Sequence, residues 1–380
     1  MGWRPAGSDD QVGGVPARFV AAPADTGQAA EILRAAEADG LAVAVRGGGT
    51  KLDWGLPPRR LDLIVDTHRL TGVVEHAAGD LITVVRAGTV LSELDFGAQQ
   101  LALDSPLPGA TVGGVLATNT SGPRRQLYGT ARDLVIGMTV VRPDGTVTRS
   151  GGKVVKNVAG YDLGKLFTGS YGTLGLITEC AFRLHPVPPA RAVVLREADV
   201  PEVGPLLAAV RGEQVVPTAV EIDHDGSGPV TIAVLVEGTA EGVRDRAARL
   251  EKVLGGTVAD LPSWWGAHPW PAGGVGVKLT APLSRVPELL GIAPGTTVRG
   301  SAGSGVLYAG VTGDVPRSIE LLRAAAVRAG GHAVVLTAPR EVREAVDVWG
   351  PVPGLALMRR VKDRFDPGHR FAPGRFVGGI

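Results

Sequence analysis

Three glycine-rich segments, each following a strand-like run of apolar residues, constrain the fold of this chain more than any other feature. They are Arg46–Lys51 (RGGGTK), Pro108–Gly114 (PGATVGG) and the end of Gly151–Glu179, which reads GGKVVKNVAGYDLGKLFTGSYGTLGLITE. Glycine inside a regular element costs about 0.5–1 kcal/mol relative to alanine, so a dense cluster needs a reason. Flexible filler is usually poor in apolar residues, whereas the third segment carries several. We therefore interpret these segments as backbone that must come close to something.

The chemistry of the first loop favours a phosphate. Glycine allows successive N–H groups to point into a concavity that binds anions, and Arg46, Thr50 and Lys51 would add to it. The alternative, that each glycine run is only a tight turn, stays open at this point. No G-x-x-x-x-G-K-[ST] is present, and no G-x-G-x-x-G opens a helix after a strand. These absences leave a phosphate-bearing ligand held by loops between strands.

Composition excludes several other classes of protein. The 380 residues carry 39 basic and 38 acidic side chains, which gives no case for a nucleic-acid groove or an anionic membrane surface. Cys180 is the only cysteine, so the chain cannot form an internal disulfide or supply a multi-cysteine iron–sulfur or zinc site. No run of 18 apolar residues and no secretion signal is found, and we expect a cytoplasmic protein without a membrane span.

The first half of the chain predicts a mixture of strands and helices. Asp25 and Gln28 form a variant of the capping box, followed by apolar residues at helical spacing, and Gly40 is placed to end that helix. Pro143-Asp144-Gly145 between two β-branched runs predicts a hairpin. Strands are also expected over residues 41–45, 61–66 and 81–88, and a helix over residues 90–100.

The second half changes character after a proline cluster. Pro186, Pro188 and Pro189 predict a domain boundary. The mixed order of elements that follows suits an antiparallel sheet with helices on one face. The expected helices span residues 200–212, 240–254, 284–289 and 315–329, and the strands lie near residues 219–222, 230–236, 275–279, 297, 306–309 and 332–336.

At this point four segments carry a family resemblance. They are RGGGTK, GATVGGVLATNTSGPRRQLYGTARDLV, the third glycine-rich segment and the ending FDPGHRFAPGRF. Together they resemble the FAD-binding family of vanillyl-alcohol oxidase and p-cresol methylhydroxylase, and more narrowly the FAD-binding subunit of bacterial glycolate oxidase. The resemblance covers roughly residues 20–186 and the last twenty. It implies an α+β fold with a two-subdomain FAD-binding domain (residues 1–188), a smaller α+β cap (189–354) and a C-terminal segment (355–380) returning to the FAD domain.

The resemblance also implies which residues hold the cofactor. The pyrophosphate would lie on the first two loops, other residues would line the cofactor further along, and the third loop would follow the adenosine half. The implied cofactor-binding residues are Arg46, Gly47, Gly48, Gly49, Thr50, Lys51, Pro108, Ala110, Thr111, Gly113, Gly114, Ala117, Thr118, Ser121, Gly122, Tyr128, Gly129, Thr130, Asp133, Gly172, Thr173, Gly175 and Ile177.

Two departures from the family pattern are informative. Relatives with covalently attached flavin place a histidine directly after the first loop's glycines, where this chain has Thr50, so we expect non-covalent FAD. The usual C-terminal pattern is Asn-Pro-Gly, and Ala372 stands in place of the asparagine.

Catalytic residues are not evident from the sequence. A 2-hydroxy-acid oxidase needs a cation for the carboxylate and a base for the hydroxyl proton. The H-x-G-D-G-N metal motif of related catalytic subunits is absent, and none of the seven histidines is spaced as a metal pair. Lys278 and Arg285 would suit a carboxylate, although lone basic residues are usually solvated. We assign no catalytic residue and no metal.

Three other features have open alternatives. Pro262–Trp270 (PSWWGAHPW) is an aromatic lid, a partner hot spot or a loop packed on the cap. The adjacent Arg124 and Arg125 face phosphate, a partner or solvent. Cys180 is expected to be a small core residue.

The resemblance favours one function over two alternatives. The first reading is an FAD-binding subunit of a glycolate (2-hydroxy-acid) oxidase complex, working with a catalytic flavoprotein and an iron–sulfur subunit, and located at the membrane only through partners. The alternatives are a stand-alone FAD oxidoreductase acting on another hydroxy acid or alcohol, and a non-catalytic assembly subunit.

Overall fold

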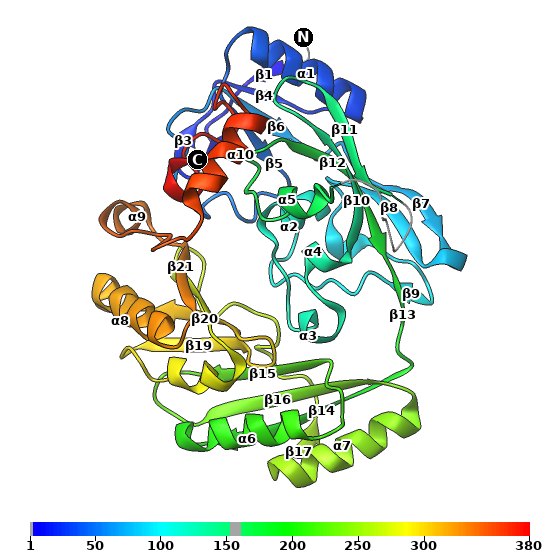
Figure 1. The fold of residues 1–380 in the computed structure, drawn as a ribbon, viewed down its shortest axis with the longest axis vertical. Helices are drawn as coiled ribbons and strands as arrows, with labels where there is room; N and C mark the ends of the chain where they lie inside the picture. Colours follow the sequence, from blue (N-terminus) through cyan, green and yellow to red (C-terminus); the bar gives the residue numbers. More distant parts are fainter. Residues whose placement is uncertain (1–2, 153–160) are drawn as a thin grey trace. The chain divides into compact units, whose positions relative to one another are not determined.

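The computed structural model describes residues 3–152 and 161–380 and divides the chain into two compact units. Residues 153–160 of the third glycine-rich segment lie outside the described residues. Unit 1 comprises Met1–Ser121, Thr130–Pro186 and Val352–Ile380, and unit 2 comprises Gly122–Gly129 and Val187–Pro351. Each unit contains strands and helices, and the expected α+β class is confirmed (Figure 1).

Unit 1 is built on two sheets. The first has the order β1-β4-β6-β5, in which β4, β6 and β5 are parallel, and the second is an antiparallel sheet of order β11-β10-β12-β8-β7. The strands are β1 Trp3–Pro5, β2 Gln11–Val12, β3 Val15–Pro16, β4 Phe19–Ala21, β5 Val43–Arg46, β6 Leu63–Asp66, β7 Val73–Ala77, β8 Ile82–Arg86, β9 Gln99–Gln100, β10 Val135–Val141, β11 Val147–Gly151, β12 Leu176–Arg183 and β13 His185–Pro186. The helices are α1 Thr26–Ala38, α2 Val112–Thr118, α4 Ala131–Leu134, α5 Gly164–Phe167 and α10 Leu355–Phe365.

Helix α1 forms as its sequence predicts. The Asp25 carboxylate accepts the N–H of Gln28 (2.8 Å), and the Gln28 side chain accepts an N–H from the residue before the cap. Leu33 is fully buried on the face toward the sheet, and Gly40 follows the helix at φ +61°. The predicted hairpin is formed by β10 and β11, with Gly145 at φ +73° in its turn.

The helix predicted over residues 90–100 is wrong. Only Leu91–Glu93 turn, as a short 3-10 helix, and the chain then extends into β9. The Asp95 carboxylate accepts the N–H of Gly97 at 2.9 Å, and Gly97 takes φ +66°. This side-chain-to-backbone hydrogen bond competes with helical hydrogen bonding, so the helix does not continue despite the helical spacing of the apolar residues.

Unit 2 contains an eight-stranded antiparallel sheet of order β17-β14-β16-β15-β19-β20-β18-β21. Its strands are β14 Ala190–Ala198, β15 Ala219–His224, β16 Val230–Gly238, β17 Thr257–Ala259, β18 Val275–Thr280, β19 Thr296–Ser301, β20 Val306–Val311 and β21 His332–Thr337. Its helices are α3 Arg125–Tyr128, α6 Val200–Gly212, α7 Ala240–Leu254, α8 Val315–Arg328 and α9 Arg340–Ala345, while Leu283–Leu289 form a 3-10 helix. Figure 1 shows α6 and α7 lying along β14 and β16, as expected for helices on one face of the sheet.

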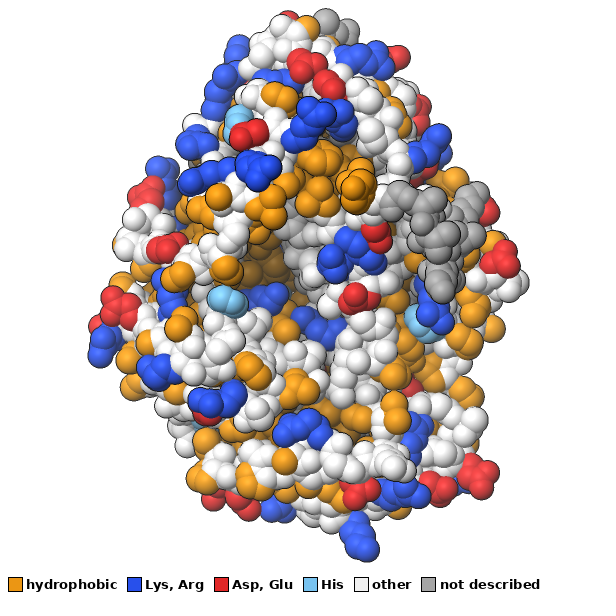
Figure 2. Space-filling view, in the orientation of Figure 1, with side chains coloured by type: hydrophobic (Ala, Val, Ile, Leu, Met, Phe, Trp, Pro, Cys, Tyr) orange, Lys and Arg blue, Asp and Glu red, His pale blue; other side chains and the backbone are white. Residues whose placement is uncertain are grey.

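The surface carries mixed charge. Figure 2 shows basic and acidic side chains interspersed on the displayed face, which agrees with the net charge of +1. Among the described residues, no helix combines the length and the apolar composition that crossing a bilayer requires.

Candidate functional site

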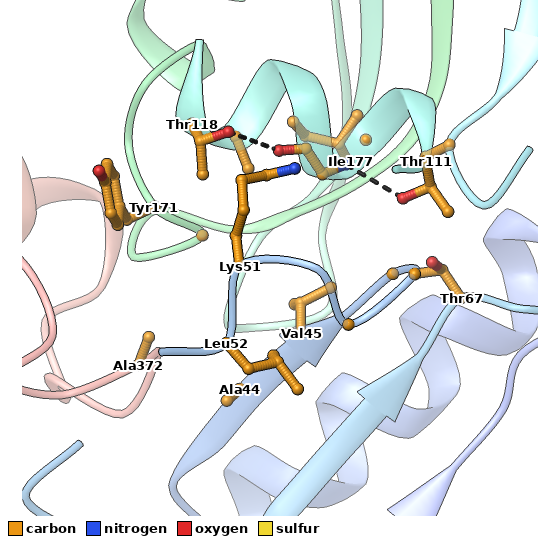
Figure 3. A pocket seen from close by; sticks show the side chains of 18 of the residues that line it. Ala44, Val45, Lys51, Leu52, Thr67, Thr111, Thr118, Tyr171, Ile177 and Ala372 are labelled. Carbon is orange, nitrogen blue, oxygen red and sulfur yellow. Dashed lines mark hydrogen bonds between the residues drawn. The ribbon is translucent and has the colours of Figure 1, made fainter. Parts of the chain in front are cut away.

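A pocket in unit 1 forms where the three glycine-rich loops meet. It contains about 840 Å³ of space, part of it open to solvent. β5 leads into the first loop, α2 begins at the second, and the third precedes β12 (Figure 3). The lining residues are Ala44, Val45, Gly47, Gly48, Gly49, Thr50, Lys51, Leu52, Thr67, Ala87, Thr111, Gly113, Gly114, Ala117, Thr118, Tyr171, Gly172, Gly175, Ile177, Ala372 and Arg375. Loops far apart in the sequence therefore build one concave surface.

Some of these glycines are required because one loop rests on another. A Cβ at Gly48 would collide with the carbonyl oxygen of Gly109, and a Cβ at Gly47 would collide with the Thr111 hydroxyl. A Cβ at Gly113 would lie 2.9 Å from the Cβ of Ala87. These positions hold the loops together whether or not a ligand is present.

Other glycines leave the pocket open. A Cβ at Gly172 would meet nothing within 4 Å, and one at Gly114 would meet only the Thr111 hydroxyl, at 3.2 Å. Side chains at these positions would occupy the pocket rather than the protein interior. This is the backbone cradle expected around a ligand that needs close approach.

Helix α2 fixes the second loop. The Thr111 hydroxyl accepts the N–H of Gly114 (3.3 Å), and the Thr118 hydroxyl donates to the Gly114 carbonyl (2.9 Å). The N–H of Gly113 donates to the Ala87 carbonyl at the end of β8 (2.7 Å). Both bonds to Gly114 appear as dashed lines in Figure 3.

Within the described part of the chain, Lys51 is one of the two cationic side chains that line the pocket, the other being Arg375. Its side chain is 9% exposed and extends toward α2 in Figure 3. The ammonium group donates to Thr50 Oγ1 (3.2 Å) and lies 5.9 Å from the Trp54 ring centre, while no acidic side chain among the described residues forms an ion pair with it. Burial lowers the pKa of Lys51 to about 8. A buried cation without a counter-charge is costly, and an anionic ligand would remove that cost.

Arg46, in contrast, is already neutralised. Its guanidinium contacts Asp10 at 2.9 Å and Asp66 at 2.7 Å, and it does not line the pocket. Hydrogen bonds from Arg4 and Arg46 hold the pKa of Asp10 below its usual range. Burial acts to raise the pKa of Asp66, but hydrogen bonds from His68 and Arg46 outweigh it and the pKa is lowered. Arg46 therefore has a structural role, because its ion pair with Asp66 links the ends of β5 and β6.

The C-terminal segment completes the wall of the pocket. The chain after α10 returns beside β5, where Val43 bridges Phe371, and brings Ala372 and Arg375 into the lining. Lys362 is 1% exposed, and its ammonium donates to Asp366 (2.6 Å) and to the carbonyl oxygens of Thr173 (2.7 Å) and Phe371 (2.9 Å). One lysine thus ties the third loop to the C-terminal segment.

Ala372 has an unusual backbone conformation. It lies at φ +43° in the left-handed region and is 2% exposed. Asparagine and glycine tolerate this region better than alanine, which bears a Cβ without a local hydrogen bond. The family's asparagine at this position therefore has a conformational reason that the sequence alone did not reveal.

The structure brings together thirteen of the predicted cofactor residues, and ten lie outside the pocket lining. Those in the lining are Gly47, Gly48, Gly49, Thr50, Lys51, Thr111, Gly113, Gly114, Ala117, Thr118, Gly172, Gly175 and Ile177. Those outside it are Arg46, Pro108, Ala110, Ser121, Gly122, Tyr128, Gly129, Thr130, Asp133 and Thr173. Of the latter, Gly122, Tyr128 and Gly129 belong to unit 2.

Eight lining residues were not predicted. They are Ala44, Val45, Leu52, Thr67, Ala87, Tyr171, Ala372 and Arg375. Most are apolar residues adjoining the predicted loops, and their exposure to the pocket has no sequence signal. Ala372 and Arg375 lie in the ending that carries the family resemblance, which is the signal from which they could have been predicted.

Two smaller predictions can be compared with the structure. Cys180 is fully buried in the unit 1 core, as expected, and burial raises the pKa of its thiol. Trp264 and Trp265 of the tryptophan loop pack against a buried cluster of unit 2 that includes Val193 and Leu235. For these two tryptophans the structure supports the packed-loop alternative.

Comparisons with known proteins identify a matching domain that lies largely in unit 1. Residues 17–151 match the family model described as FAD binding domain. Similar proteins are an uncharacterized FAD-linked oxidoreductase of Mycobacterium tuberculosis (32% identity; 66% of this chain and 57% of the relative), the D-lactate dehydrogenase of Archaeoglobus fulgidus (38%; 44% and 38%) and the glycolate oxidase subunit GlcE of Escherichia coli (36%; 45% and 50%). The chain thus spans between 38% and 57% of the length of these relatives.

The fold has counterparts among solved structures. Alkyldihydroxyacetonephosphate synthase superposes with a TM-score of 0.69 at 16% identity, over 94% of this chain and 76% of that one. This similarity concerns the fold alone. The chain therefore contains an FAD-binding domain of the matched family and is related to glycolate oxidase subunits and FAD-linked oxidoreductases.

Proposed function

We propose that this chain is the FAD-binding subunit of a glycolate-type (2-hydroxy-acid) oxidase or dehydrogenase. The observation that carries the proposal is the pocket that the glycine loops form around Lys51. It places a buried cation without an acidic partner in a region that matches an FAD-binding domain. The relatives named as a D-lactate dehydrogenase and a glycolate oxidase subunit support the choice of a small 2-hydroxy acid.

Within this proposal each loop has a role. Lys51 would bind the pyrophosphate, which would lie against the bare backbone at Gly113 and Gly114, and Gly172 and Gly175 would lie along the rest of the dinucleotide. The other predicted cofactor residues remain proposals of the same kind. When bound, FAD supplies hydride acceptance at its flavin N5. Thr50 stands where a histidyl link would form, so the proposed binding is non-covalent.

The domain organisation is proposed accordingly. Residues 1–188 and 355–380 would form the FAD-binding part, and residues 189–354 the cap. A catalytic flavoprotein and an iron–sulfur subunit are the proposed partners, in the cytoplasm. The relative named as a glycolate oxidase subunit supports a multi-subunit enzyme.

An anaerobic visible spectrum tests the proposal. The purified chain is expected to show flavin bands, and glycolate or D-lactate is expected to bleach them only after the catalytic and iron–sulfur partners are added. Bleaching by the chain alone would favour a stand-alone oxidoreductase. Flavin that no combination of substrate and partner reduces would favour an assembly subunit, and purified protein that neither carries nor takes up FAD would refute the proposed site.

A further inference from the structure

One face of the unit 2 sheet carries a row of polar side chains at the same level. Strand register places Asp223 of β15 opposite Arg299 of β19, Arg299 opposite Tyr308 of β20, and Tyr308 opposite Lys278 of β18. Directly opposed residues project from the same face, with Cβ atoms about 4.5–5.5 Å apart. The adjoining positions Val277 and Leu307 project from the opposite face, where they are fully buried and apolar.

Part of the row is neutralised within the protein. Arg299 Nε donates to Asp223 at 2.7 Å, and its guanidinium lies 5.7 Å from the Trp264 ring centre. These contacts satisfy the charge of Arg299 at one end of the row. At the other end, no acidic side chain in the described part of the chain forms an ion pair with Lys278 or a hydrogen bond with Tyr308.

Two cations flank the Tyr308 hydroxyl without a carboxylate. Arg125 Nη2 donates to Tyr308 Oη at 3.1 Å and its Nε donates to the Gly122 carbonyl at 2.9 Å. Among the described residues, no acidic side chain forms an ion pair with Arg125 or Lys278. Burial lowers the pKa of Lys278, Tyr308 opposes that shift, and the nearby Arg125 adds to it. An external counter-charge would stabilise two half-buried cations that repel each other in this way.

The aromatic rings of His268 and Trp270 lie near Tyr308, beside the two cations. Gly276 and Gly310 oppose each other on β18 and β20, and the chain at Trp270 lies against them: a Cβ at Gly276 would be 2.5 Å from the Trp270 ring. The ring of His268 stacks on Trp270 (4.3 Å between centres) and meets Tyr308 edge-on (4.7 Å). The paired glycines thus make room for an apolar surface next to the charged groups.

We propose that Arg125, Lys278 and Tyr308 bind the carboxylate of a small organic acid, with Trp270 and His268 against its body. The proposal rests on the proposed function and assigns its substrate-recognition residues. Arginine offers a planar fork that matches a carboxylate, lysine adds a point charge and the phenol adds a donor. Arg285, the other cation considered from the sequence, is half-exposed and donates to Glu288 at 2.8 Å, so it belongs to a surface ion pair instead.

Calorimetric titration of the FAD-loaded full chain with oxalate, a carboxylate that the flavin cannot oxidise by hydride transfer, tests the site. We expect Lys278→Met and Arg125→Gln each to weaken oxalate binding about tenfold or more, since each removes a charge-assisted bond. Tyr308→Phe, which removes one oxygen and risks no misfolding, should weaken it severalfold. The matched control Arg285→Gln should stay within about twofold of wild type.

The readouts separate this site from the proposed function. In one outcome, oxalate binding depends on these residues while glycolate fails to reduce the flavin even with the partners present. That result would support the site and refute the proposed reaction. Absent oxalate binding, or variants that bind it like wild type, would overturn the site even where glycolate bleaches the flavin. Inorganic phosphate binding as tightly as oxalate would overturn the assignment to a carboxylate.

Discussion

Replacing Lys51 with methionine should change two properties of the protein in opposite directions. The pKa of Lys51 falls from 10.5 to about 8 on folding. At 1.36 kcal/mol per pKa unit, the buried charge destabilises the flavin-free chain by about 3 kcal/mol. Because the folded pKa lies below the unfolded one, this cost is fully present below pH 8 and fades as the pH rises toward 10.5. Lys51→Met should therefore stabilise the flavin-free protein at pH 7.

The same substitution should weaken FAD binding. A charged hydrogen bond to phosphate contributes about 1.5–3 kcal/mol, so the dissociation constant should rise roughly ten- to a hundredfold. Bound pyrophosphate would raise the pKa of Lys51 again, so wild-type affinity should be constant below pH 8. Above pH 8 it should fall about tenfold per pH unit until the bound pKa is reached, and the variant should lack this fall.

Thermal unfolding of the flavin-free protein and titration of FAD between pH 7 and 10 measure both effects. Lys51→Arg keeps the charge and should retain most of the affinity, and the exposed Lys252→Met should change neither property. A Lys51→Met protein that loses stability without flavin, or that binds FAD as wild type does with the same pH dependence, would refute the reasoning.

Three further substitutions test the rest of the site. Gly114→Val should abolish FAD retention while the protein stays folded, whereas Gly48→Ala should lower the unfolding temperature even without flavin, because its Cβ meets a loop carbonyl; equal unfolding temperatures would contradict this contrast. Ala372→Asn should raise the stability of the flavin-free protein by about 1 kcal/mol in chemical denaturation, since asparagine relieves the left-handed strain. Lys362→Met should cost about 3–5 kcal/mol, because it leaves Asp366 buried without its cation, and should lower flavin content; a smaller loss than for an exposed lysine would argue against the contact.

Much of the fold was predictable because its signals are local. The capping pair that starts α1 and the turn at Gly145 act within a few residues, and both appear as expected. In unit 2 the alternation of strands and helices also matches. The failure at residues 90–100 came from another local signal, the Asp95 carboxylate bonding to Gly97, which competed with the apolar period.

The sequence predicted which loops form the site, but not which of their residues face the pocket. Glycine runs identify where the backbone must be bare, but not which glycine faces a ligand and which faces another loop. Gly48 and Gly114 look alike in sequence, yet a Cβ at the first would strike a carbonyl and at the second would narrow the pocket. The return of Ala372 to the wall depends on Lys362 and Phe371, contacts that span much of the chain and leave no periodic trace.

Three lysines with lowered pKa values differ in whether the chain itself supplies a partner for their charge, and this difference distinguishes a structural lysine from a ligand-binding one. Lys362 donates to a carboxylate and to two carbonyl oxygens, all from this chain. Its charge is therefore compensated within the protein, and its role is to hold loops together. Lys51 and Lys278 are also at least partly shielded from water, but no carboxylate among the described residues pairs with either. Lys51 lines the pocket of unit 1, and Lys278 lies opposite Tyr308, whose hydroxyl accepts from Arg125. Since an uncompensated buried cation is retained only at a cost, an anion from outside the chain is the simplest reason for both. Under the two proposals above, FAD would supply the anion in unit 1 and a small organic acid would supply the anion in unit 2.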